Sequence, residues 1–104
     1  MTTDRLYNAI GLCQRAGKAK SGAFAAENAI RTGKAKLVLL EETASEATRM
    51  HYEQLCAAHG VPLMLVETVG SAIGKDARIV MAVTDPSFRD LIERAVRNTD
   101  EKRG

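Results

Sequence analysis

The sequence predicts an α/β fold: a three-layer α/β/α sandwich around a small mixed, mostly parallel sheet of about four strands. Three continuous apolar runs, at residues 37–40, 63–66 and 79–83, have the length of strands. Runs of this kind are typical of strands covered on both faces. They alternate with segments in which apolar residues recur every three or four positions, the spacing of amphipathic helices. Strands that alternate with helices favour a sheet with helices on both faces.

Length and composition indicate a single globular domain. The chain has 104 residues, of which 45% are hydrophobic and 27% charged, values usual for one domain. Two Tyr, two Phe and no Trp predict an aliphatic core. We expect the domain to cover residues 1–98 and residues 99–104 to form a frayed polar tail.

The first part of the chain predicts a helix, a very short strand and a second helix. Asp4 is a candidate N-cap for a helix that runs to about Arg15. Residues 19–21 are expected to form the short strand. Residues 23–32 have helical spacing, and Gly33 is placed to end that helix. The first long apolar strand follows.

A capping-box pattern predicts the third helix. Thr43 and Glu46 have the required spacing, and the helix is expected to continue to about His59. The residues expected to face inward are Ala47, Met50, Leu55 and Ala58. The second apolar strand and a single short helix between Gly70 and Gly74 come next.

Asp85 and Pro86 mark the start of the last helix. Asp is a favoured N-cap, and Pro is tolerated in the first turn, where its missing N–H has no helical partner to lose. The residues expected on its inner stripe are Phe88, Leu91, Ile92, Ala95 and Val96.

Charge is distributed unevenly along the chain. The net charge is +2, but residues 1–36 contain seven basic and two acidic residues, a net +5, so the remainder carries −3. Such an asymmetry indicates one basic face and a polyanionic partner.

The basic segment at residues 15–22 is the strongest candidate for contact with that partner. Gly17 and Gly22 mark sharp changes of backbone direction, and the second helix begins directly afterwards. Unpaired N–H groups at a helix start, beside Arg15, Lys18 and Lys20, favour an anion such as phosphate. The alternative is a solvated, charged turn between two helices.

The sequence offers little for catalysis, metal binding or membrane insertion. It has no glycine-rich nucleotide loop and no Cys/His cluster, and His51 and His59 lie eight residues apart, unlike a metal pair. Cys13 and Cys56 fit helical apolar stripes, which indicates buried reduced thiols, with a disulfide as the alternative. No apolar run approaches the roughly 20 residues of a membrane span, and the N-terminus lacks a signal-peptide core. We expect a cytoplasmic protein without catalytic residues, metal or cofactor.

Several segments together carry a resemblance to a known family. Their order and spacing, over about residues 6–96, resemble the kink-turn-binding ribosomal-protein family, the large-subunit "seven-Ae/thirty-e" type, and most closely its small bacterial ribosomal-protein-like members. The segments are residues 15–18, 21–22, 29–38, 70–75 and 82–85. The resemblance implies a non-catalytic α/β/α domain that binds a sharply bent RNA internal loop. It places the start of the second helix in the RNA groove and the loop after the short late helix over a flipped-out base.

The resemblance also assigns site residues, with a departure at the reading positions. Gly22 matches the motif glycine that lets the backbone approach RNA. Phe24, Ala25 and Asn28 stand where the motif has Asn, Glu (or a close polar substitute) and Lys. Phe24 and Ala25 offer no base-edge hydrogen bonds, whereas Asn28 keeps a donor and an acceptor but no charge. Phe24 is expected either to stack on a base or to cover an apolar patch. The residues expected to contact phosphates are Arg15, Lys18, Lys20, Lys34, Lys75 and Arg78.

Three hypotheses for function follow. The first is an RNA-binding protein whose partner is structured RNA, a kink-turn or ribosomal RNA, and which is associated with the ribosome or another RNA and is monomeric. The second is a protein-interaction module that has lost RNA recognition and docks through the apolar surface of Phe24–Ala26. The third, ranked last, is a small enzyme that uses Glu41, Glu42 and Asp85 at strand ends.

Overall fold

The four strands form one mixed sheet in the order β1-β4-β2-β3. The computed structural model describes residues 2–103, and side chains from residue 5 to residue 97. Its elements are α1 (Thr2–Arg15), β1 (Ala19–Ser21), α2 (Ala23–Arg31), β2 (Leu37–Glu41), α3 (Glu46–His59), β3 (Leu63–Val66), α4 (Gly70–Ile73), β4 (Val80–Val83) and α5 (Pro86–Arg103). The predicted four-stranded mixed sheet and the alternation of helices and strands are confirmed.

Two of the three strand pairings are antiparallel, so the expectation of a mostly parallel sheet is wrong. β2 and β3 pair in parallel, whereas β4 is antiparallel to both β1 and β2. The connection from β3 to β4 contains only the four-residue α4, which does not carry the chain back along the sheet. β4 therefore starts at the edge where β1, β2 and β3 end, which we call the Gly22 edge.

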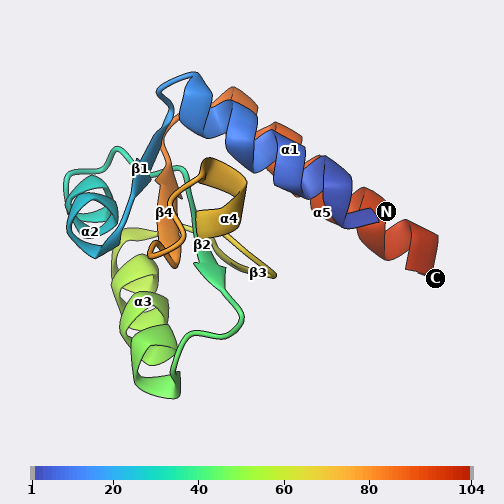
Figure 1. The fold of residues 1–104 in the computed structure, drawn as a ribbon. Coiled ribbons are helices and arrows are strands. Elements are labelled where there is room, and N and C mark those ends of the chain that lie inside the picture. The colour runs from blue at the N-terminus through green and yellow to red at the C-terminus, as the bar shows by residue number, and fades with distance from the viewer. Residues whose placement is uncertain (1, 104) are drawn as a thin grey trace.

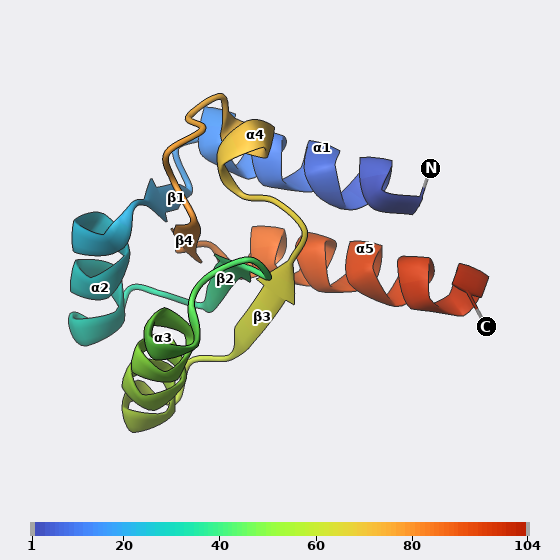
Figure 2. The same ribbon diagram turned by 60° about the horizontal axis from the view of Figure 1, so that its bottom comes forward.

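Helices cover both faces of the sheet, as predicted. Alternate residues of β2 enter two separate cores: Leu37 and Leu39 face α1, α4 and α5, whereas Val38 and Leu40 face α2 and α3. Figures 1 and 2 show α1 and α5 side by side and antiparallel on one side, with α2 and α3 on the other. Among the described residues, no helix combines the length and apolar character of a membrane span.

The two cysteines lie in different cores. Cys13 belongs to the α1 side of the sheet and Cys56 to the α3 side, and both are buried free thiols. Burial, together with the charge of Asp85, raises the pKa of Cys13 to about 11, and burial alone raises the pKa of Cys56 to about 11. The sheet separates the two sulfurs, which rules out the disulfide alternative in this fold.

The inward face of α3 differs in part from the predicted one, because Leu55 packs against the core as predicted but the other three residues do not. Tyr52 and Cys56 are its buried residues, whereas Ala47 and Ala58 are exposed and Met50 is 47% exposed. Side chains four residues apart share a helix face, so Tyr52 and Cys56 lie together against the sheet. Apolar spacing alone does not distinguish the two faces.

The N-cap of α3 also differs from the predicted one. Ser45 is the cap, and its Oγ accepts from the backbone N of Thr48 at 3.1 Å. Thr43 precedes the helix by two residues more and does not cap it. An N-cap hydroxyl accepts from the backbone N–H three residues later. Ser45 has this spacing to Thr48, just as Thr43 has it to Glu46, so the spacing alone does not identify the cap.

Ser45 and Thr43 offer a matched pair of variants. Ser45→Ala should lower the free energy of unfolding by about 1 kcal/mol, the usual loss for an N-cap. Thr43→Ala should change it by less than about 0.5 kcal/mol, as for an ordinary surface substitution. Urea denaturation of both variants measures the difference. A larger loss of unfolding free energy for Thr43→Ala than for Ser45→Ala would show that Thr43 is the cap.

The structure contradicts the predicted cap of α1 and the predicted burial of β3, and it confirms the predicted cap of α5. α1 begins at Thr2, so Asp4 lies within the helix rather than capping it. β3 is an edge strand with Leu65 42% exposed, not a strand covered on both faces. Asp85 does cap α5, since its Oδ1 accepts from the N of Ser87 at 2.7 Å.

Along α5, Leu91 is exposed, whereas the other predicted inner residues are buried or half-buried. The backbone of α5 continues as helix to Arg103, past the predicted domain limit at residue 98. The side chains of residues 98–104 lie outside the described part, and fraying of the tail stays a prediction.

Candidate nucleic-acid interface

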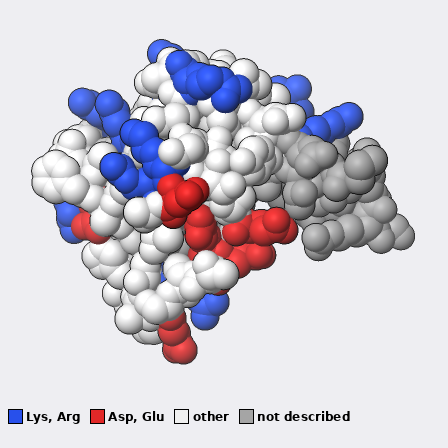
Figure 3. Space-filling view, viewed as in Figure 1, with Lys and Arg blue, Asp and Glu red and all other residues white. Residues whose placement is uncertain are grey.

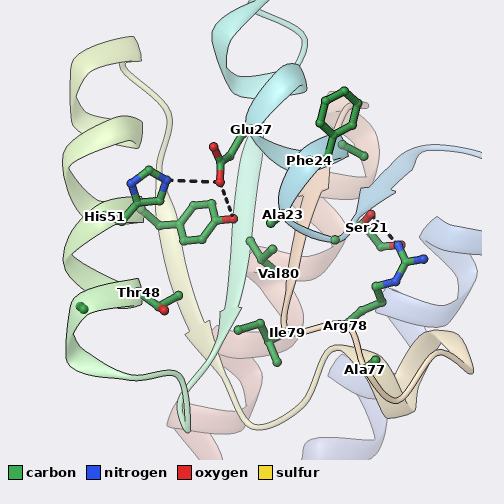
Figure 4. Close-up of a pocket in the computed structure, with 14 residues that line it drawn as sticks. Ser21, Ala23, Phe24, Glu27, Thr48, His51, Ala77, Arg78, Ile79 and Val80 are labelled. Carbon is green, nitrogen blue, oxygen red and sulfur yellow. Dashed lines mark hydrogen bonds and ion pairs between the residues drawn. The ribbon is translucent and has the colours of Figure 1, made fainter.

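Two turns far apart in sequence meet at the Gly22 edge. The first follows β1 at Gly22, and the second, residues 74–79, leads from α4 into β4. The N of Gly22 donates to the O of Val80 at 2.9 Å. Arg78 Nη1 donates to the O of Ser21 at 2.9 Å and to its Oγ at 3.3 Å (Figure 4). The guanidinium of Arg78 is therefore held in place beside the start of α2.

Gly22 is required by both its conformation and its contact. Its φ of 89° and ψ of 159° lie in a region that only glycine occupies readily. A Cβ at this position would lie 2.7 Å from Arg78 Nη1. The absence of a side chain is therefore what lets Arg78 pack against this turn.

The second turn is fixed from below by α4. Glu41 Oε1 accepts from the N of Val69 at 2.8 Å and from the N of Gly70 at 3.2 Å. Gly70 is buried, and backbone carbonyls of the turn lie where its Cβ would be. Glu41, a candidate of the enzyme hypothesis, thus stabilises the start of α4 and the loop that presents Lys75 and Arg78.

An open groove of about 760 Å³ lies next to the two turns. It runs between the start of α2, the first half of α3 and the start of β4, and most of its surface is apolar. Phe24 stands at its rim and is 90% exposed, so it does not cover an apolar patch of its own molecule. Figure 4 shows Phe24 and Arg78 on one side of the groove and His51 on the other.

A polar cluster that the sequence did not reveal lines the far side of the groove. Glu27 Oε2 accepts from the Tyr52 hydroxyl at 3.1 Å and lies 3.2 Å from His51 Nε2. Glu27 Oε1 lies 3.2 Å from Arg31 Nη1. Partial burial acts to raise the pKa of Glu27, but hydrogen bonds from Tyr52 and His51 outweigh it and hold the pKa below its ordinary value. Only the Glu27–Arg31 spacing could have been found from sequence.

The nine predicted contact residues do not form a single group. Gly22, Phe24, Lys75 and Arg78 lie at the Gly22 edge, with Asn28 one turn further along the exposed face of α2. Lys20 is exposed on the edge strand β1, and Arg15 ends α1.

Lys18 and Lys34 lie at the opposite edge of the sheet. The O of Lys18 accepts from the N of Thr84 beyond the end of β4, and Lys18 Nζ lies 4.0 Å from Asp85 Oδ2. Lys34 follows the carboxyl end of α2. β1 and α2 each run from one edge of the sheet to the other. Lys18 and Lys34 therefore do not share a single site with Gly22.

Lys and Arg side chains lie at several places on one face of the molecule (Figure 3). Figure 3 shows Lys and Arg over the region of β1 and the end of α1, with a group of Asp and Glu next to it near the middle of the same face. Carboxylates therefore border the basic surface on one side. Among the described residues, no group of three or more His, Cys, Asp or Glu side chains could hold a metal ion.

Comparison with known proteins places this geometry in a family. Residues 4–92 match the ribosomal protein L7Ae/L30e/S12e/Gadd45 family. The chain belongs to this family. It is 44% identical over 86 residues to the RNA-binding protein YlxQ of Bacillus subtilis (strain 168), covering 80% of this chain and 86% of YlxQ. The family resemblance seen in the sequence is confirmed.

Solved structures share the fold of this L7Ae-family chain. A protein of unknown function from Bacillus halodurans superposes with a TM-score of 0.80 at 28% identity, over 88% of this chain and 96% of that one. The Giardia lamblia 15.5kD RNA binding protein superposes with a TM-score of 0.74 at 21% identity, over 96% of this chain and 88% of that one. At that identity the second likeness shows the fold alone.

Proposed function

We propose that this L7Ae-family chain binds structured RNA, without catalysis, through the surface around Gly22, Lys75 and Arg78. The observation that carries the proposal is the Arg78–Ser21 contact, which fixes a cation beside the exposed start of α2. Lys75 and Lys20 add exposed cations nearby. Cations on a rigid frame position a phosphate backbone, and membership of the family and the RNA-binding name of the YlxQ relative support the same role.

We further propose a kink-turn or ribosomal RNA as the natural target and a monomeric, cytoplasmic, ribosome-associated protein. The exposed start of α2 is the element that the family resemblance places in the RNA groove. Because Phe24 and Ala25 carry no base-edge donors or acceptors, phosphate contacts should supply most of the affinity.

A gel-shift titration tests both levels of the proposal. The probes are a kink-turn RNA and the same RNA with its sheared G·A pairs changed to Watson–Crick pairs. The kink-turn should bind more tightly. If the protein makes three phosphate contacts, raising the salt concentration from 50 to 200 mM should weaken binding about 15- to 40-fold. Equal affinity for both RNAs would remove kink-turn recognition, and no binding at low salt would remove the RNA role.

The alternative is a protein-interaction module on the same fold. The 90% exposed Phe24 ring favours it, because an apolar ring in water is a usual interface anchor. A protein complex held by Phe24 would be abolished by Phe24→Ser and would be nearly insensitive to salt. Binding that falls steeply with salt would reject this alternative.

A further inference from the structure

Phe24 is the most exposed aromatic side chain among the described residues. It occupies the first turn of α2, where packing against the sheet is the task of Ala26, Ala29 and Ile30 on the opposite face. Its ring is 90% exposed, whereas the ring of Tyr52 is buried. Burial in the folded chain therefore does not explain a large apolar ring at this position, and a bound partner must be considered.

The surroundings of Phe24 match a nucleotide better than a protein surface. Arg78, fixed by Ser21, lies on the same side of the groove as Phe24 (Figure 4). Apart from Phe24 and Ile79, which is 37% exposed, the apolar lining of the groove consists of alanines and of the buried Tyr52 and Val80. A protein interface has a core of several apolar side chains, whereas one ring beside a cation matches one base and its phosphate.

We infer that Phe24 is a stacking platform for one unpaired base of the bound RNA, with Arg78 contacting the adjoining phosphate. This inference rests on the proposed RNA-binding function. Within a duplex both faces of each base are covered by its neighbours, so the platform requires a base in a bulge or loop. Stacking uses the face of the base rather than its edge, so the site tolerates any base and makes Phe24 selective for unpaired structure, not for sequence.

Phe24→Leu isolates the stacking contact. Leu keeps an apolar side chain but removes the ring, and a 90% exposed position should leave the free energy of unfolding unchanged. The full chain is titrated with the kink-turn RNA and with the same RNA whose bulge is closed by complementary nucleotides. Phe24→Leu should weaken binding to the bulged RNA about 5- to 160-fold and leave the paired RNA unaffected. Phe24→Tyr should restore the affinity.

A fluorescence readout separates stacking from a general effect on the surface. With 2-aminopurine at each bulge position in turn, the wild-type protein should quench one position, Phe24→Tyr should do the same, and Phe24→Leu should not. Equal affinity and equal quenching for wild type and Phe24→Leu would overturn the platform while RNA binding stands. An equal loss on bulged and paired RNA would also overturn it. Failure of the wild type to bind either RNA would overturn the proposed function together with the platform.

Discussion

Arg78→Gln lowers the affinity for kink-turn RNA by about ten-fold or more on this account. A hydrogen bond that involves a charged group, such as the one expected from Arg78 to an RNA phosphate, is worth about 1.5–3 kcal/mol. The substitution also removes the guanidinium that donates to the O of Ser21 at 2.9 Å. The slope of log affinity against log salt should become shallower by about one, because one phosphate contact is lost. The measurement is a filter-binding titration at several salt concentrations.

Arg94→Gln is the matched control for the Arg78 variant. Arg94 is an exposed arginine of α5, on the other side of the sheet from α2. Its substitution removes the same net charge at a position away from the groove. Its affinity and salt slope should stay close to those of the wild type. Equal losses for the two variants would show that the overall charge and not the Gly22 edge governs binding. Unchanged affinity and slope for Arg78→Gln would show that Arg78 makes no phosphate contact.

Gly70→Ala should cause the largest loss of stability of any variant discussed, about 3 kcal/mol in the free energy of unfolding. An added Cβ would lie 2.5 Å from the O of Lys75, 2.7 Å from the O of Arg78 and 2.9 Å from the O of Asp76. All three are backbone atoms, which cannot move aside as a flexible side chain could. The turn would have to separate from α4, which would also displace the guanidinium of Arg78.

Gly33→Ala separates this clash from ordinary backbone strain. Gly33 has a φ of 78° and open space where its Cβ would lie, so alanine there meets only the cost of a left-handed conformation, about 1 kcal/mol. Urea denaturation should rank Gly70→Ala well below Gly33→Ala. Similar stabilities for the two variants would mean that the turn accommodates a Cβ, and the packing described for residues 74–79 would be wrong.

Local signals in the sequence were sufficient for most elements of the fold. The apolar run of β2, the Gly33 end of α2 and the Asp85 cap of α5 each depend on neighbouring residues, and each is found where it was predicted. The direction of β4 is not local, because it depends on how far α4 carries the chain along the sheet. The face that α3 turns inward depends on the sheet in the same way.

The site was predictable only in part for the same reason. Gly22 and the basic turn at Arg78 could be identified as backbone and charge features, but their contact depends on the antiparallel pairing of β1 with β4. That pairing also separates Lys18 from Gly22, although only Ala19, Lys20 and Ser21 lie between them. The Glu27–Tyr52–His51 cluster joins residues of two helices, and no spacing in the sequence predicts it.

Amide chemical shifts recorded during titration with the kink-turn RNA test the central claim directly. We expect the backbone signals of residues 22–28 and 75–79 to change together and to saturate at the same RNA concentration. Those of α5 and of the Lys18 and Lys34 edge should stay in place. Changes confined to the Lys18 and Lys34 edge, or to α1 and α5, would show that RNA binds elsewhere and that the meeting of the two turns serves the fold alone.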